Sequence, residues 1–347
     1  MRSLVRVKDI GEQLDGQPVL EILLSNPHAA ITLFSFGATL QKFEIEVPDF
    51  HKRDIVLGYK DCDTYQRTFE KRPNAYFGAI VGPIAGRISN AKIPFKDGFF
   101  QLEANEGPHH LHGGKRSFSN VNWKLLSYKE NPYPQVTFLL ETKAYRIEHP
   151  GNLRCEVSYT LQEFTLEIKI ESIALEDTLA NPTQHTYFNP NGHQGSVLDI
   201  EAWIAADSSI ELNKEKLPTG RILPLNGDHS FPSTTTTTTY SGYPLHSRFE
   251  GLDHSFILNA KKQQAQLIAA DRFELRFDTN QPVLQVYVGG ETNIPGKDEI
   301  KYHRYSGICL EQQAEPDAPN HENFSDIYLL KGQRKTNNIL INFEQHK

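Results

Sequence analysis

Apolar and polar residues alternate one by one along several stretches of this chain, and no other feature restricts its possible folds as strongly. In residues 164–171 the apolar side chains fall at every second position, and residues 155–161, 273–277 and 284–288 repeat this spacing. Successive side chains of a β-strand point to opposite faces, whereas a helical face repeats every 3.6 residues. The pattern therefore predicts strands with one buried face and one solvated face.

Turn-forming residues separate these runs. Residues 189–192 read Asn-Pro-Asn-Gly and residues 96–98 read Lys-Asp-Gly, which are typical of turns between strands. Helical spacing is almost absent, and residues 61–69 are one of the few places where we expect a short helix. No linker-like change of composition interrupts the chain. We therefore predict an all-β fold, a large antiparallel sandwich, with residues 1–347 forming a single domain.

Six consecutive threonines, residues 234–239, form the one low-complexity segment. Threonine favours β-strands, so an edge strand is one interpretation. A surface loop is equally compatible with the composition. Neither interpretation assigns chemistry to the segment.

The charge balance and the cysteines limit the possible partners and compartment. The chain has 36 lysines and arginines against 43 aspartates and glutamates, a formal net charge of -7. This mild acidity gives no electrostatic reason to bind nucleic acid or an anionic membrane. No apolar run resembles a signal-peptide core or reaches the ~18 residues of a membrane span. The three cysteines are scattered, which is typical of free thiols in a reducing compartment, and we expect a cytosolic protein.

Four segments combine ionisable side chains with glycine, proline and asparagine in a way that a plain sandwich does not require. They are residues 82–88 together with 105–114, residues 181–189, residues 309–320 and the shorter 251–256.

Single residues within these segments are open to more than one interpretation. Arg87 taken alone is more often a surface or paired arginine, and Asp317 is more often a turn former. His109 and His110 are interpreted as loop residues. Glu311 follows two apolar residues, a context in which a carboxylate is either paired or has a shifted pKa.

The spacing of His110 and His112 matches the start of a cupin-type metal site, which also needs a glutamate a few residues later. The following residues are instead Gly113 and Gly114, then Lys-Arg-Ser. Because the carboxylate is missing, we predict no metal. The two glycines favour a tight turn that brings the backbone close to a ligand. No phosphate-binding loop, dinucleotide fingerprint or serine-nucleophile motif occurs, so we also predict no cofactor.

Taken together, the motifs resemble the galactose mutarotase (aldose 1-epimerase) family. No single one is specific, but five occur in the family's order and at similar spacing. They are Arg87, Leu111-His112-Gly-Gly, Asn181-x-Thr-x-His185-x-Tyr-Phe-Asn, Asp253-His and Glu311-x-Gln-x-x-Pro-Asp-Ala-x-Asn.

The resemblance implies a β-supersandwich with an open cleft that binds a free hexose. It implies that Glu311 is the base that takes the proton from the C1 hydroxyl and that His185 is the acid that protonates the ring oxygen. His112 would support the ring oxygen or a neighbouring hydroxyl, while Arg87 and Asp253 would hold sugar hydroxyls. Elementary chemistry agrees, because anomerisation needs only a proton removed from O1 and a proton delivered to O5.

Two alternatives remain open at this stage. A related epimerase could act on hexose 6-phosphates, for which Lys115 and Arg116 beside the Gly-Gly turn could supply positive charge. The same scaffold could also bind a sugar without catalysis. The preferred hexose and the oligomeric state are not encoded in any motif that we identify.

Overall fold

The computed structural model describes residues 3–14, 16–47, 52–69, 75–225, 243–244, 252–290 and 293–345. Strands dominate this part of the chain, as predicted. Its single α-helix is α1 (Cys62–Phe69), which confirms the helix expected at residues 61–69. The threonine run lies outside the described residues. Short 3-10 turns complete the secondary structure: η1 (Ser89–Ala91), η2 (Phe118–Asn120) and η5 (Ala318–Asn320).

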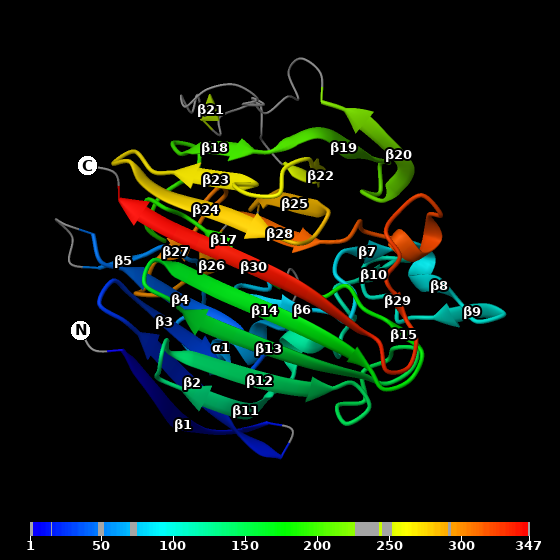
Figure 1. Ribbon diagram of the computed structural model, residues 1–347, viewed down its shortest axis with the longest axis horizontal. Coiled ribbons are helices and arrows are strands. Elements are labelled where there is room, and N and C mark those ends of the chain that lie inside the picture. The colour runs from blue at the N-terminus through cyan, green and yellow to red at the C-terminus, as the bar shows by residue number, and fades with distance from the viewer. Residues whose placement is uncertain are drawn as a thin grey trace.

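One layer is a nine-stranded sheet, which faces the viewer in Figure 1. In spatial order its strands are β11 (Lys124–Lys129), β12 (Gln135–Glu141), β13 (Leu153–Leu161), β14 (Thr165–Ala174), β30 (Arg334–Gln345), β24 (Phe273–Thr279), β23 (Ala265–Ile268), β18 (Glu201–Ile204) and β21 (Tyr243–Pro244).

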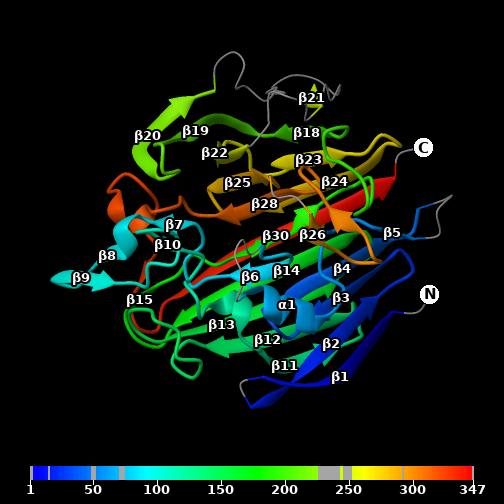
Figure 2. The same cartoon turned by 180° about the vertical axis from the view of Figure 1, so that it is seen from behind.

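Two further sheets lie side by side behind it and are seen from the other side in Figure 2. The first has the order β1 (Leu4–Leu14), β2 (Gln17–Ser25), β3 (Ala29–Phe34), β4 (Thr39–Ile45) and β5 (Arg53–Asp54). The second has the order β17 (Tyr187–Phe188), β28 (Ile308–Gln313), β25 (Val283–Val288), β22 (Asp253–Leu258), β19 (Ala206–Leu212) and β20 (Pro218–Pro224). An isolated bridge between Val56 and Phe188 joins the two.

Five short antiparallel strand pairs lie in the segments that connect the strands of these three sheets. They are β7 (Arg87–Ile88) with β10 (His110–Leu111), β6 (Ala79–Val81) with β16 (Thr183–His185), β8 (Lys92–Phe95) with β9 (Gly98–Gln101), β15 (Thr178–Leu179) with β29 (Tyr328–Leu329), and β26 (Ile294–Pro295) with β27 (Lys301–Tyr302).

The core fills the space between the layers, because the apolar face of each alternating strand points there. Phe343 on β30 meets Phe43 on β4 with ring centroids 5.6 Å apart, and Phe277 on β24 meets Phe188 on β17 at 5.0 Å. The predicted inward positions of β13, β24 and β25 are all buried. Phe164 is an exception, since it lies before β14 and is 50% exposed. In these four runs, strand alternation thus identifies the buried positions correctly except at this strand end.

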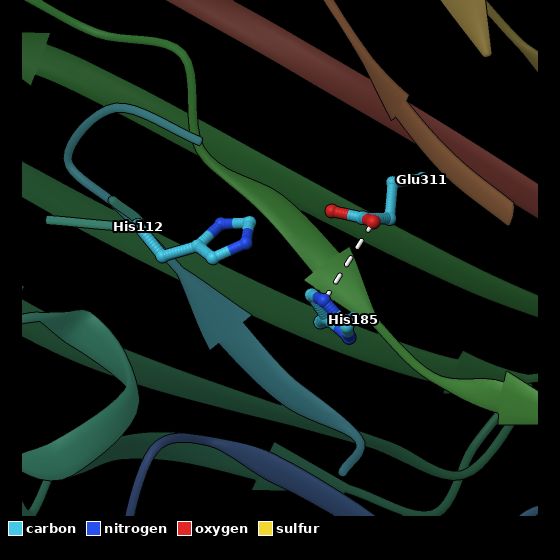
Figure 3. Close-up of side chains that lie close together, drawn as sticks. All are labelled: His112, His185 and Glu311. Atoms are coloured by element: carbon cyan, nitrogen blue, oxygen red, sulfur yellow. Dashed lines mark ion pairs between the residues drawn. The ribbon is translucent and has the colours of Figure 1, made fainter. Parts of the chain in front are cut away.

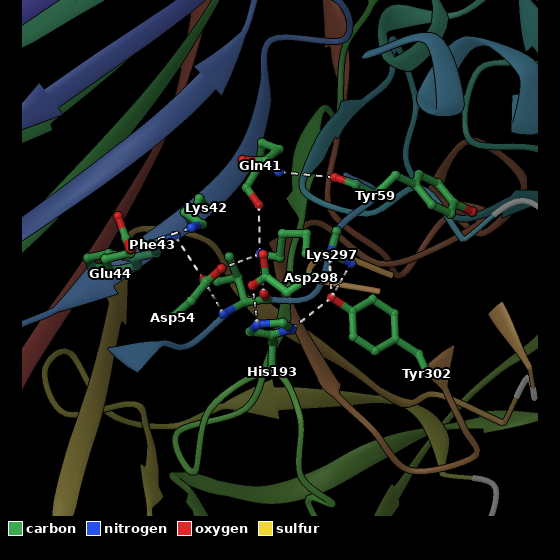
Figure 4. A network of polar contacts seen from close by, with 12 residues as sticks. Gln41, Lys42, Phe43, Glu44, Asp54, Tyr59, His193, Lys297, Asp298 and Tyr302 are labelled. Carbon is green, nitrogen blue, oxygen red and sulfur yellow. Dashed lines mark hydrogen bonds and ion pairs between the residues drawn. The ribbon is translucent and has the colours of Figure 1, made fainter. Parts of the chain in front are cut away.

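A buried lysine fastens the five-stranded sheet to the loop before β27. Lys297 is 2% exposed, and its ammonium donates hydrogen bonds to the Gln41 carbonyl at 2.9 Å and to Asp54 Oδ2 at 2.6 Å (Figure 4). It also donates to the Val56 carbonyl at 2.7 Å. All three of its N–H donors therefore have acceptors. Burial lowers the pKa of Lys297, and the charge of Asp54 opposes that change. This contact supports the Val56–Phe188 bridge between the two rear sheets.

Within the described residues, no helix is long and apolar enough to cross a membrane.

Candidate active site

A cleft of about 500 Å³ opens on the face of the six-stranded sheet opposite the one that packs into the core. Its lining combines aromatic, amide and ionisable side chains: Ala75, Tyr76, Gly86, Arg87, Glu106, Leu111, His112, His185, Tyr187, Leu212, Lys216, Asp253, Ser255, Gln285, Tyr287, Glu311, Gln313 and Pro316.

The same alternation that builds the core also builds the floor of this cleft. On β25, Leu284 and Val286 point into the core, so Gln285 and Tyr287 point into the cleft. Cross-strand pairing sets Gln285 beside Ser255 of β22 and Glu311 of β28. The cleft floor is therefore the second face of strands whose first face forms the core.

Glu311 lies within strand β28 and is 3% exposed. Its Oε2 atom is buried and has no hydrogen-bond partner among the described residues. Burial raises the pKa of Glu311 to about 8; the charge of Asp253 adds to this, and Arg87 opposes it. The carboxyl group is therefore largely protonated at neutral pH, with one oxygen free to meet a ligand.

His185 is the last residue of β16 and lies opposite Ala79 of β6. Its Nε2 atom lies 3.6 Å from Glu311 Oε1, and Figure 3 shows the two side chains facing each other. Burial lowers the pKa of His185 to about 4, against smaller effects of a hydrogen bond with its own backbone and of Asp253. At neutral pH both groups of the His185–Glu311 pair are therefore uncharged, and the proton that they can exchange lies on the carboxyl group.

His112 follows β10 and adopts a left-handed φ of 50°. Its Nδ1 atom accepts a hydrogen bond from the Gly86 N–H at 3.3 Å, and its backbone N–H donates to the Gly86 carbonyl at 3.2 Å. Burial, together with His185 and Arg87, holds the pKa of His112 well below its usual value. A neutral imidazole that accepts at Nδ1 carries its hydrogen on Nε2, so His112 offers the cleft a donor.

Arg87 and Asp253 also line the cleft. The Asp253 carboxylate accepts hydrogen bonds from Lys216 Nζ at 3.0 Å and from Gln285 Nε2 at 2.8 Å. Arg87 lies 4.0 Å from Asp253 and 3.8 Å from Glu106. Each cation in the cleft thus already lies beside a carboxylate.

The structure brings all five predicted site residues, Glu311, His185, His112, Arg87 and Asp253, to one cleft. Motif spacing did not identify Gln285, Lys216, Tyr76 and Glu106, which also line it. For Gln285 a signal was available, because it occupies a polar position between the apolar residues 284 and 286.

One interpretation of the histidine-glycine segment is wrong, that of His110. His110 belongs to strand β10 rather than a loop, and both His109 and His110 are buried. Gly113 forms the predicted turn with a φ of 88°, and its backbone packs closely against the chain. A Cβ atom there would lie 1.9 Å from the Gly82 carbonyl oxygen. That this turn also lies close to a ligand stays a prediction. Asp317 is a turn residue as predicted, with a φ of 57° ahead of η5.

The residues after His112 lack the carboxylate that a metal site would need, but the folded chain brings Glu311 close to His112. Ligand atoms of His112, His185 and Glu311 all lie within 4.8 Å of one another, a set that could hold a metal ion. His110 is not part of this set, because its Nδ1 hydrogen-bonds the Glu103 carbonyl at 2.8 Å. The absence of a metal stays a prediction.

Comparisons with known proteins agree on one family. The family model described as aldose 1-epimerase matches residues 21–342. The galactose mutarotase of Rattus norvegicus is 32% identical over 329 residues, which cover 92% of each chain. The aldose 1-epimerase of Escherichia coli K12 is 29% identical over 332 residues, 92% of this chain and 93% of that protein.

Solved structures show the same fold. An aldose epimerase homologue from C. elegans superposes with a TM-score of 0.84 at 24% identity, covering 94% of this chain and 99% of that one. Galactose 1-epimerase from Lactobacillus acidophilus gives a TM-score of 0.84 at 24% identity, covering 99% and 100%. The predicted mutarotase-like β-supersandwich is confirmed.

Proposed function

Because the chain belongs to the aldose 1-epimerase family, and is therefore an isomerase of sugar anomers, we propose that it interconverts the α and β forms of a free aldohexose such as glucose or galactose. The observation that carries the proposal is the His185–Glu311 pair, two buried proton-exchanging groups 3.6 Å apart in a polar cleft. Such a pair can take a proton from one oxygen of a sugar and give one to another.

In the proposed reaction the sugar first shifts the proton within the pair. Hydrogen-bond donation from the C1 hydroxyl to the free Oε2 of Glu311 favours the carboxylate, and the displaced proton moves to His185 Nε2. The net protonation of the pair does not change. Binding thus converts the resting state into a carboxylate base and an imidazolium acid.

Ring opening then needs two proton transfers. Glu311 takes the proton from O1 while His185 gives its Nε2 proton to O5, the C1–O5 bond breaks and a C1=O1 aldehyde forms. After rotation about C1–C2, O5 attacks the other face of C1, returning its proton to His185 as O1 recovers a proton from Glu311. All protons are restored at the end of the cycle.

The remaining predicted residues have binding roles in this proposal. His112 donates its Nε2 hydrogen to the ring oxygen or an adjacent hydroxyl, because Gly86 occupies its Nδ1. Arg87 and Asp253 hold hydroxyl groups and fix the sugar against the pair. The amide of Gln313 is buried in the lining and has no hydrogen-bond partner among the described residues, so it offers both a donor and an acceptor to a hydroxyl-rich ligand.

The charge of the cleft favours a neutral sugar over a phosphate ester. Arg87 and Lys216 each lie within 4.0 Å of a carboxylate, so among the described lining residues neither cation is free for a dianion. Lys115 pairs with Glu103 at 2.6 Å, and neither it nor Arg116 lines the cleft. This removes the sequence-based support for a hexose 6-phosphate.

Polarimetry tests the proposal directly. Fresh α-D-glucose, α-D-galactose and glucose 6-phosphate would each be followed with and without enzyme. We expect accelerated mutarotation of at least one free hexose and a lower kcat/KM for the phosphate. A sugar that binds but equilibrates no faster than in buffer would support the non-catalytic alternative instead.

Two further parts of the proposal concern the whole chain. One buried cluster includes residues from Val5 to Phe343, which supports a single domain over residues 1–347. All three cysteines, Cys62, Cys155 and Cys309, are buried and free, which supports the expected cytosolic location.

A further inference from the structure

Behind the imidazole of His185 lies a thiol that the proposed reaction does not use. Cys309 Sγ is 3.6 Å from His185 Nδ1, and both side chains are buried. Cys309 stands two residues before Glu311 on β28, so strand alternation points both side chains to the same face. Glu311 faces one nitrogen of the ring and Cys309 faces the other.

A second side chain, that of Tyr187, also contacts the thiol and packs against the His185 ring, with ring centroids 5.3 Å apart. Tyr187 of β17 is the direct cross-strand partner of Cys309, and its hydroxyl hydrogen-bonds the thiol. Burial raises the pKa of Cys309 and of Tyr187 well above their usual values, so both keep their hydrogens. The Tyr187 hydroxyl donates toward the sulfur, which opposes the larger effect of burial on the pKa of Cys309, and a second sulfur lone pair remains for the imidazole.

The proton path requires one particular tautomer of His185. For Nε2 to receive the proton of Glu311 it must present a lone pair, which places the ring hydrogen on Nδ1. An acceptor at Nδ1 favours that tautomer and fixes the ring plane. Among the described side chains, Cys309 Sγ lies within hydrogen-bond distance of Nδ1, and the other hydrogen bond of the ring is with the residue's own backbone.

We propose that Cys309 is a positioning residue that accepts the Nδ1–H of His185 and thereby holds Nε2 free to exchange a proton with Glu311. A neutral sulfur is a weak acceptor, so it orients the ring without the strong stabilisation of the imidazolium that a carboxylate would give. The imidazolium therefore remains a strong acid toward the ring oxygen. The effect of Cys309 on catalysis rests on the proposed function, whereas its effect on the tautomer of His185 does not.

The tautomer is measured by NMR of protein labelled with ¹⁵N in its histidine rings, with His185→Asn used to assign the signals. We expect the Nδ1 of His185 to be protonated and its Nε2 to be unprotonated in the wild type. Cys309→Ala should shift the ring toward the other tautomer, and Cys309→Ser, which restores an acceptor, should shift it back. A wild-type His185 protonated on Nε2 would overturn the proposal.

Kinetics supply the second readout. We expect Cys309→Ala to lower kcat by roughly tenfold with little change in KM, because the proton transfer is misaligned while the sugar contacts remain. Cys309→Ser should recover most of the rate. Cys155→Ala, which also removes a buried thiol but on β13, is the matched control for packing loss.

These readouts separate the two proposals. A protein without mutarotase activity whose His185 tautomer still depends on Cys309 would contradict the proposed function and leave the positioning role intact. An active protein in which Cys309→Ala leaves both tautomer and kcat unchanged would overturn the positioning role alone.

Discussion

His185 Nε2 and Glu311 Oε1 face each other at 3.6 Å in the lining of the cleft, and their side chains are only 6% and 4% exposed. Burial disfavours the charged form of each group, so it moves their pKa values in opposite directions, down to about 4 and up to about 8. One proton shared by two buried groups is suited to a reaction that moves protons between two oxygens of the same substrate.

The first prediction concerns the loss of either group. Glu311→Gln cannot accept a proton and His185→Asn cannot donate one to the ring oxygen, so each should lower kcat by roughly 10²- to 10⁴-fold in polarimetry. Glu103→Gln and His110→Asn, outside the cleft lining, are the matched controls and should keep nearly full activity. Near-normal kcat in a folded Glu311→Gln variant would contradict the base assignment.

The second prediction is a bell-shaped pH dependence. The pair works with one proton, so kcat/KM should fall as His185 is protonated near its pKa of about 4 and as Glu311 ionises near its pKa of about 8. The measurement is the initial rate of mutarotation across pH, corrected for the buffer reaction. A rate that kept rising well above pH 8 would show that the catalytic pair is not the one described.

The third prediction links Asp253 to the alkaline limb of that profile. The negative charge of Asp253 raises the pKa of Glu311, so Asp253→Asn should lower that pKa and move the alkaline limb to lower pH. The same variant loses a partner for sugar hydroxyls and should raise KM. Asp207→Asn, an exposed carboxylate on the neighbouring β19, should change neither quantity.

The fourth prediction concerns stability. The pKa of Glu311 is higher in the folded than in the unfolded chain, so its contribution is full below the unfolded value and is lost as the pH rises toward about 8. This group alone should cost roughly 1.4 kcal/mol of unfolding free energy per pH unit in that window. Glu311→Gln lacks this loss and should become increasingly more stable than the wild type in urea unfolding from pH 5 to 8. A pH-independent difference would contradict the raised pKa.

The fifth prediction tests the lysine that fastens the rear sheets. Lys297→Met leaves Asp54 and two buried carbonyl groups without their donor, and should destabilise the fold by about 3 kcal/mol or more. Thermal or urea unfolding measures this effect. Lys301→Met, at an exposed position of β27, is the control and should change the unfolding free energy by about 0.5 kcal/mol or less.

Some of these features could be predicted from residue order alone. One-by-one alternation identified the strands and their buried faces, because a strand's two faces are encoded by neighbouring positions. It also indicated the helix at residues 61–69. The five site residues were found through motifs, because their order along the chain resembles that of a known family.

The tertiary structure decided how those residues meet. Glu311 and His185 are 126 positions apart, and no local pattern encodes that β28 and the end of β16 place them 3.6 Å from each other. Cys309 became part of the site only through the tertiary structure, and cross-strand register set Gln285 beside Glu311. Local sequence missed the burial of His110 and the chain contact of Gly113 for the same reason.

The sequence by itself determined which side chains are available, because each position fixes its residue type. It also determined on which face of a strand each one lies, because successive residues of a strand point to opposite faces. Only the tertiary structure decided their protonation. The pKa values of Glu311 and His185 depend on burial by distant strands and on the charges of Asp253 and Arg87, which long-range packing brings to the same cleft.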